Sequence, residues 1–156
     1  MYIAKKLRSQ SVSAYLIYMY QVEDLVRAYG LDADRIAAEY LPRFGYDEQQ
    51  MKEEGKEQTG HLRVVQNTLD LLEDRHKELL ADQDEHDYRA AYYKALPHIV
   101  ALRSQGNNRE KAEMENCIDA LYGATLLRMQ GKELSAATQS ALKPISELLS
   151  KIEVSG

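Results

Sequence analysis

Several ionisable and polar side chains of this sequence stand where a helix would otherwise be apolar. On a helical wheel, Glu23 falls inside the apolar arc of its segment, and His76 lies at the centre of another. A buried charge is costly unless it is paired and hydrogen-bonded. We therefore single out the polar residues that lie on or beside such arcs, which are Glu23, Arg27, Glu73, His76, Tyr92, Arg103 and Asp119.

This set of residues supports three interpretations. It could form a closed buried network that fixes the register of the helices, an interpretation that we favour. It could lie in a subunit interface, because Arg and Tyr are enriched at interface cores. It could also line an open polar pocket for a small ligand or a metal ion. The sequence leaves these alternatives open.

The most specific expectation is a buried pair of Glu23 and Arg103. Each lies within the apolar arc of its own helix, and each side chain is long enough to cross between packed helices. Tyr92 borders Arg103 and could donate its hydroxyl to the same carboxylate. We therefore predict that the two charges satisfy one another.

Metal and catalytic signatures are weak. The spacing Glu73-x-x-His76 supplies half of a carboxylate-bridged di-iron site, but the sequence holds no second Glu-x-x-His. A single metal bound by Glu23, Glu73 and His76 stays possible, and we predict no metal and no cofactor. Phosphate loops, zinc-protease motifs and serine-hydrolase motifs are absent. Cys117 lies on an apolar face, which is typical of a buried hydrophobic residue rather than a nucleophile. The sequence thus leans away from an enzyme.

The segments that must position these residues carry helical spacing. Capping and stop signals predict helices over about 12–29, 32–40, 60–81, 84–105, 108–130 and 135–152, with Ser11, Asn108 and Ser135 opening the first, fifth and sixth. The apolar stripe of the first helix is Val12, Tyr15, Met19, Val22, Val26 and Tyr29, and that of the third is Leu62, Val65, Leu69, Leu72, His76 and Leu79. Pro97 and Pro144 lie inside two of these helices and should bend them. Residues 47–57 are nearly all polar, and we leave them undecided between a helical turn and a loop. No segment alternates for long enough to form a strand. We predict an all-α, up-and-down bundle of five to six helices in one domain, residues 1–156.

Composition limits the functional class. The chain has 156 residues, 44% of them hydrophobic and 29% charged, which is typical of one globular domain. A net charge of −5 argues against nucleic-acid binding. The sequence has no apparent signal peptide and no membrane-length apolar run, so we expect a cytoplasmic protein that does not bind membranes. Eleven tyrosines against one phenylalanine and no tryptophan suggest polar groups inside a core or an interface.

Two further local features carry expectations. Gly123 lies in the middle of a predicted helix beside Ala120 and Ala124, where it should permit the close approach of another helix. The stretch 70–87 contains eight acidic residues, which predicts a face exposed to solvent.

Four blocks of the sequence resemble a known family. They are Tyr15-Leu-Ile-Tyr-Met-Tyr-Gln-Val-Glu-Asp-Leu-Val-Arg27, Gly60-His-Leu62, Tyr92-Tyr-Lys-Ala-Leu-Pro-His-Ile-Val-Ala-Leu-Arg103 and Asp119-Ala-Leu-Tyr-Gly123. Together they are similar to an uncharacterised bacterial family, found mainly in the Bacteroidetes. The resemblance implies a small all-helical cytoplasmic protein and implies no activity. The stretch between Tyr46 and Gly60 is shorter than the resemblance leads us to expect.

Two functional hypotheses follow. The first is a non-enzymatic interaction or scaffold protein that self-associates as a two-fold homodimer. The second is a helical bundle, enzymatic or not, that binds a small ligand of unknown identity or a metal through the Glu/His/Arg/Tyr set.

Overall fold

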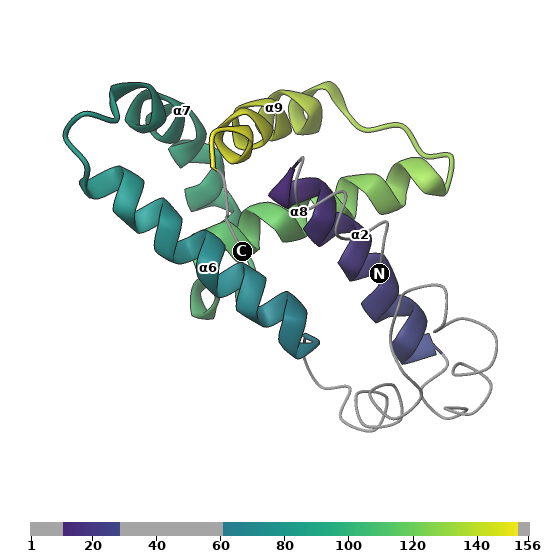
Figure 1. Cartoon of the computed structure of the whole chain (residues 1–156). Helices are drawn as coiled ribbons and strands as arrows, with labels where there is room; N and C mark the ends of the chain where they lie inside the picture. The colour runs from purple at the N-terminus through teal and green to yellow at the C-terminus, as the bar shows by residue number, and fades with distance from the viewer. Residues whose placement is uncertain (1–10, 29–60, 153–156) are drawn as a thin grey trace. The chain divides into compact units, whose positions relative to one another are not determined.

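The computed structural model describes residues 11–28 and 61–152 of the chain. In these ranges it contains five α-helices, one 3₁₀ helix and no strand, which confirms the predicted all-α class (Figure 1). The elements are α2 (Val12–Ala28), α6 (Arg63–Ala81), α7 (His86–Arg103), η1 (Asn108–Glu110), α8 (Glu113–Met129) and α9 (Ala136–Ser150). The helix predicted over 32–40 and the undecided segment 47–57 lie outside the described residues.

The chain divides into two compact units, residues 1–68 and 69–156. The boundary falls inside α6, so the first residues of this helix belong to one unit and the remainder to the other. Each unit is described by itself below. That the chain forms one domain over 1–156 stays a prediction.

The first unit contains α2, whose core face follows the predicted spacing. Ser11 caps the helix as expected, since its hydroxyl oxygen accepts the Ala14 N–H at 3.2 Å. The buried hydrophobic side chains of α2 are Val12, Tyr15, Leu16, Met19, Tyr20, Val22 and Val26. The predicted stripe of α2 is confirmed except at Tyr29, which lies outside the described residues.

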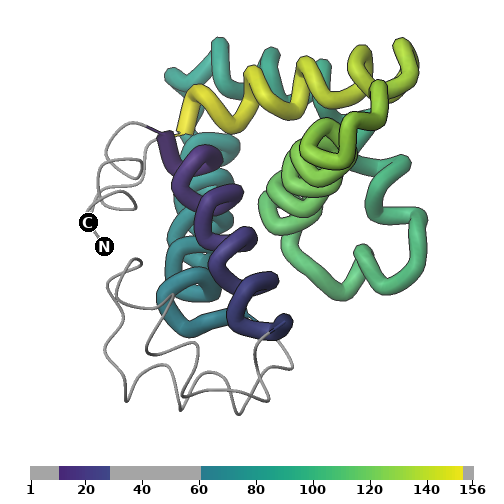
Figure 2. Tube along the Cα trace, turned by 90° about the vertical axis from the view of Figure 1, so that its right-hand side faces the viewer, coloured from purple at the N-terminus to yellow at the C-terminus, as the bar shows by residue number. Residues whose placement is uncertain are grey.

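The second unit contains most of α6 together with α7, α8 and α9. In this unit α7 packs against both α8 and α9 (Figure 2). The stripe predicted for α6 is buried along its whole length, at Leu62, Val65, Leu69, Leu72, His76 and Leu79. No helix among the described residues is long and apolar enough to cross a membrane.

Capping explains where the later helices begin and end. Ser135 caps α9 as predicted, since its Oγ accepts the Thr138 N–H at 3.1 Å. Gly131 follows α8 with a φ of +75°, a left-handed conformation that favours glycine. Asn108 does not open α8, because its side-chain amide donates to the carbonyl of Leu102 at 2.8 Å. It begins the short helix η1 instead, and α8 starts five residues later at Glu113.

Three residues inside helices test further expectations. Helices α7 and α9 continue across Pro97 and Pro144, and the bends predicted there stay predictions. The close approach predicted at Gly123 is not made by the described residues. A Cβ added at Gly123 would meet nothing within 4 Å.

Candidate functional site

Five side chains from three helices converge in the second unit, and we call them the His76 cluster. They are Glu73 and His76 on α6, Tyr88 and Tyr92 on α7, and Glu113, the first residue of α8. Helical spacing aligns the members within each helix, because residues three or four positions apart share one face. Three of the seven residues predicted from sequence, Glu73, His76 and Tyr92, thus belong to one cluster.

The imidazole of His76 is the centre of the cluster and is 2% exposed. Its Nδ1 lies 2.5 Å from the Tyr88 hydroxyl, and its Nε2 lies 3.5 Å from Oε2 of Glu113. The hydroxyl of Tyr92 donates to the same Glu113 oxygen at 2.9 Å. The ring centroids of His76 and Tyr92 are 5.2 Å apart. Both ring nitrogens of His76 therefore have partners inside the protein.

Glu73 caps a helix. Its Oε2 accepts the backbone N–H of Met114 at 3.1 Å, in the first turn of α8. The N–H groups of a helix's first turn have no partner within the helix, so a carboxylate there satisfies one of them and complements the helix dipole. The two residues of the predicted half-motif Glu73-x-x-His76 thus have different partners: Glu73 joins α6 to α8, and His76 joins α6 to α7.

Hydrogen bonding and burial set the protonation states of the cluster. The hydrogen bond with His76 lowers the pKa of Glu113, and the bond from Tyr92 acts in the same direction, whereas burial opposes them. Burial raises the pKa of both Tyr88 and Tyr92, and the bond to Glu113 adds to the shift of Tyr92. Glu113 is therefore ionised at neutral pH, and both tyrosines keep their protons.

The cluster is built for structure rather than for acid–base catalysis. A general base must reach the proton that it removes, and the ring of His76 is buried with both nitrogens occupied. Glu113, whose side chain is 30% exposed, is half-buried, accepts the Tyr92 hydroxyl and lies 3.5 Å from Nε2 of His76. The cluster is a closed polar network, but Glu23, Arg27, Arg103 and Asp119, which we grouped with it from the sequence, bond elsewhere.

Glu23 forms a separate polar site in the first unit. The carboxylate is 1% exposed, and its Oε1 lies 2.9 Å from Nδ1 of His61. Its Oε2 accepts the Leu62 N–H at 2.7 Å. The Tyr20 ring stacks on the His61 ring with centroids 5.0 Å apart. Glu23 thus anchors the start of α6 to α2.

Arg103 holds the connection between α7 and α8. Its Nη1 donates to the Lys111 carbonyl at 2.7 Å and to Oδ1 of Asn116 at 2.8 Å, and its Nη2 donates to the Arg109 carbonyl at 3.2 Å. The Lys111 ammonium in turn pairs with Asp119 at 3.1 Å. Arg103 and Asp119 therefore stabilise the connection and do not join the His76 cluster.

Two sequence predictions are corrected by these contacts. The expected pair of Glu23 and Arg103 is wrong, because each charge is satisfied by groups close to its own helix. Arg27 is exposed rather than part of an apolar face, and it forms a 3.0 Å ion pair with Asp24 in the next turn back. An arginine at the edge of an apolar arc can turn its long side chain to solvent.

Three partners were missed from the sequence. His61 received no chemical role, because it lies in the first turn of the helix predicted over 60–81, whereas α6 begins only at Arg63. Glu113 was placed inside the second turn of a helix expected to start at Asn108, which hid its position at the true helix start. Asn116 is 2% exposed, and an uncharged amide on an apolar face gives a weaker signal than a charge.

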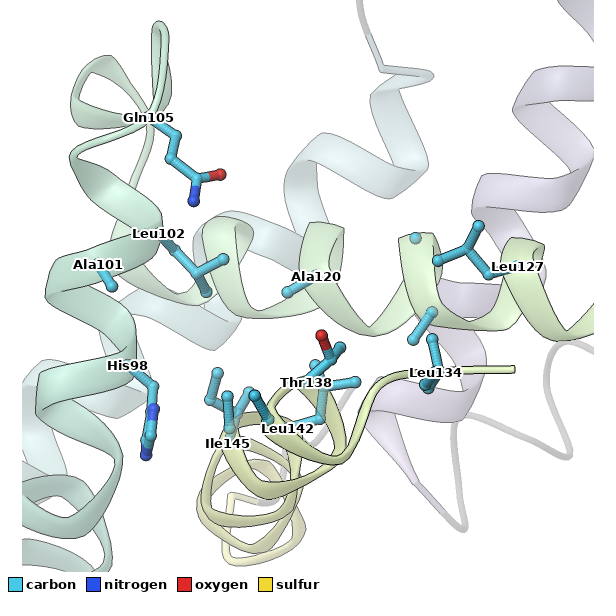
Figure 3. Close-up of a pocket in the computed structure, with 14 residues that line it drawn as sticks. His98, Ala101, Leu102, Gln105, Ala120, Leu127, Leu134, Thr138, Leu142 and Ile145 are labelled. Atoms are coloured by element: carbon cyan, nitrogen blue, oxygen red, sulfur yellow. The ribbon is translucent and has the colours of Figure 1, made fainter. Parts of the chain in front are cut away.

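An open apolar groove lies on the second unit between α7, α8 and α9, with a cavity volume of about 440 Å³ (Figure 3). Its polar lining is sparse and includes His98 of α7, Gln105 just after the end of α7, and Thr138 of α9. None of the seven polar site residues predicted from the sequence lines this groove, whereas Ala120, Gly123 and Ala124, where we expected the close approach of a helix, do line it.

Fold and site together define an all-helical protein with closed internal polar networks and one open apolar groove among the described residues. Residues 1–155 match the family described as "Domain of unknown function (DUF4924)". The chain belongs to this family, which covers nearly its whole length. No curated protein and no solved structure matches the chain.

Proposed function

We propose that the protein is a non-enzymatic helical scaffold that self-associates as a homodimer in the bacterial cytoplasm. The observation that carries this proposal is a second apolar face on α7. We call this face the α7 ridge, and it consists of Tyr93, Leu96, Pro97 and Val100. A buried free thiol at Cys117 is compatible with a reducing compartment.

The α7 ridge lies opposite the core face of its own helix. At 100° per residue, Tyr93 and Val100 point about 140–180° away from the buried residues Ala91 and Ala95, and about 100–120° away from Ile99. The exposed fractions of Tyr93 and Val100 are 65% and 58%. The residues follow the i, i+3, i+4, i+7 spacing by which helices pack on one another. A helix that is apolar on two faces is typical of one that packs on both sides.

A second copy of the chain is the partner that this surface favours. The ridge contains no charged residue, so covering it removes no charge from water. Aromatic side chains such as Tyr93 are enriched at interfaces, and two-fold dimers are the commonest oligomers. Pro97 leaves the Tyr93 carbonyl without its helical partner, which suits a position at the surface.

The competing hypothesis of a ligand- or metal-binding site in the predicted polar set has less support. Glu23, Arg103 and Asp119 bond to groups outside the His76 cluster. The cluster itself is closed around His76. At the centre of the cluster, both ring nitrogens of His76 already have protein partners and are not available to a ligand.

Sedimentation equilibrium of the full chain at micromolar concentration tests the proposal. We expect a mass of twice the 17.8 kDa chain mass for the wild type. Val100→Glu places a charge in the interface and should weaken association by about tenfold or more. Lys94→Glu, an exposed change on the same helix but off the ridge, should leave the mass unchanged. A wild type that sediments as a single 17.8 kDa species contradicts self-association.

A further inference from the structure

Small residues from all three helices line the groove between α7, α8 and α9. They are Ala101 on α7, Ala120, Gly123 and Ala124 on α8, and Ala137 and Ala141 on α9. Larger apolar residues at these positions would fill the space and bury more surface, which would stabilise the fold. The sequence instead keeps the groove open, and Figure 3 shows Leu127, Leu142 and Ile145 among its apolar side chains.

Among these small residues, Gly123 gives the most specific reason to expect an occupant. A glycine inside a helix is less favourable than alanine, by about 1 kcal/mol. The backbone of α8 at Gly123 is helical and requires no glycine, and a Cβ there would meet no described atom within 4 Å. Nothing in the described fold therefore explains why Gly123 lacks a side chain. A molecule bound in the groove would explain it, because that molecule would occupy the space of a side chain.

A polar hollow adjoins the groove at Leu142, which lines both. We call it the cationic hollow; its cavity volume is about 340 Å³, and Arg128 and Lys143 line it. Neither cation forms an ion pair with any residue that the structure describes. Glu147 also lines the hollow, so one carboxylate stands against two cations. The hollow thus carries a net positive charge on a chain whose net charge is −5.

We propose that the groove and the cationic hollow together bind a single-chain amphiphile with a carboxylate head, of the fatty-acid class. The apolar chain lies in the groove over Gly123, and the carboxylate lies in the hollow near Arg128 and Lys143. Pockets of this size and apolar character are typical of small-ligand sites. A carboxylate accepts charge-assisted hydrogen bonds from Arg and Lys, and this selects an anionic head over a neutral or cationic one. The site is independent of the α7 ridge, so either proposal can fail alone.

Dodecanoate, titrated below its aggregation concentration into the full chain, is the probe. Isothermal titration calorimetry should detect saturable binding at one site per chain. Dodecyltrimethylammonium has the same chain with a cationic head and should bind at least about tenfold more weakly. Shortening the chain to decanoate removes two methylenes and should cost up to about fourfold in affinity for each. Equal affinities for the two head groups would overturn the assignment of the hollow.

Variants locate the ligand within the site. Gly123→Leu fills the groove from α8 and should abolish detectable binding, while thermal melts establish that it folds. Lys143→Gln removes one cation and should weaken dodecanoate binding by about threefold to tenfold. Lys151→Gln is the matched control, since this exposed lysine at the end of α9 lines neither cavity. Full binding by a folded Gly123→Leu variant would overturn the proposal.

Two further experiments distinguish a free amphiphile from a membrane surface and from a second copy of the chain. Flotation with vesicles of anionic phospholipid should leave the protein unbound, because the ligand is a free amphiphile; binding to vesicles without binding of dodecanoate contradicts the proposal. Sedimentation of Gly123→Leu should give the wild-type mass. A loss of oligomers in this variant would show that a second copy of the chain fills the groove, which also contradicts it.

Discussion

The carboxylate of Glu73 on α6 accepts the backbone N–H of Met114 on α8, 41 residues later in the chain, at 3.1 Å. A side chain of one helix therefore caps the first turn of another. Capping of this kind usually comes from the residue just before the helix, but here that residue is Ala112, which has no side-chain acceptor. The start of α8 at Glu113 thus depends on the packing of α6.

Replacing Glu73 tests this cap. Glu73→Ala should lower the free energy of unfolding by about 1–2 kcal/mol, because the Met114 N–H loses its acceptor. Glu73→Gln keeps an acceptor oxygen and should cost less than half as much. Urea denaturation followed by circular dichroism measures both. Equal losses in the two variants would show that the charge, and not the hydrogen bond, is what matters.

The buried carboxylate of Glu23 should be coupled to His61 and not to Arg103. Glu23→Ala should cost about 3 kcal/mol, because it leaves the Leu62 N–H without its acceptor and His61 without its partner. In a double-mutant cycle with His61→Ala, the double variant should lose about 1 kcal/mol less unfolding free energy than the sum of the two single losses. The corresponding cycle of Glu23→Gln with Arg103→Met should be additive within about 0.5 kcal/mol, because the two residues share no bonded partner. Coupling in the second cycle would restore the pairing expected from the sequence.

Glu113 should make the fold sensitive to acid. Its pKa is lower in the folded state than in the unfolded chain, so its contribution to stability is present above the unfolded value of about 4.3 and is lost as the pH falls through the folded value. The urea midpoint of the wild type should therefore fall more steeply below pH 4.3 than that of Glu113→Gln. Glu110→Gln, an exposed change in η1, is the control and should retain the wild-type slope.

Two glycines should respond oppositely to the same substitution. Gly123→Ala should raise the free energy of unfolding by about 1 kcal/mol, since the helix gains propensity and the new methyl group meets no described atom. Gly131→Ala should lower it by about 1 kcal/mol, since alanine is strained at a φ of +75°. Thermal melts of the two variants beside the wild type measure the difference. Destabilisation by Gly123→Ala would mean that this site is already occupied in the purified protein.

Cys117 should be unreactive in the folded protein. The side chain is 0% exposed, and burial raises the pKa of its thiol to about 12, so thiolate is scarce at pH 8. A thiol reagent such as Ellman's should label it slowly in buffer and completely in denaturant. Rapid labelling in buffer would indicate that the core around α8 opens readily.

Local patterns predicted the helices well because burial repeats with the helical period. The stripe through His76 is buried at every predicted position, and Ser11 and Ser135 cap their helices as their sequence neighbours suggest. Such features depend on residues within four positions of each other. For the same reason the wheel correctly identified Glu23 as a buried acid.

The partners of the polar residues could not be predicted in the same way. Which group meets Glu23 depends on how separate segments pack. The helix predicted over 60–81 included His61, but α6 begins at Arg63, so a wheel position does not describe the His61 side chain. The wheel also treats a side chain as a fixed direction. Arg103 is long enough to turn towards carbonyls of the following connection, so its wheel position does not reveal its contacts. The groove was missed because small residues leave no hydrophobic signal.

The contacts of Arg103 also bear on how the chain could change in length. One guanidinium joins the end of α7 to the carbonyls of Arg109 and Lys111, so the connection between α7 and α8 must keep both carbonyls within reach of a single side chain. Surface connections ordinarily accept inserted residues. We expect this one to reject them, since even a short insertion after Asn108 would carry the Lys111 carbonyl away from Arg103. Tags and fused domains are therefore better placed outside the span from Arg103 to Asn116.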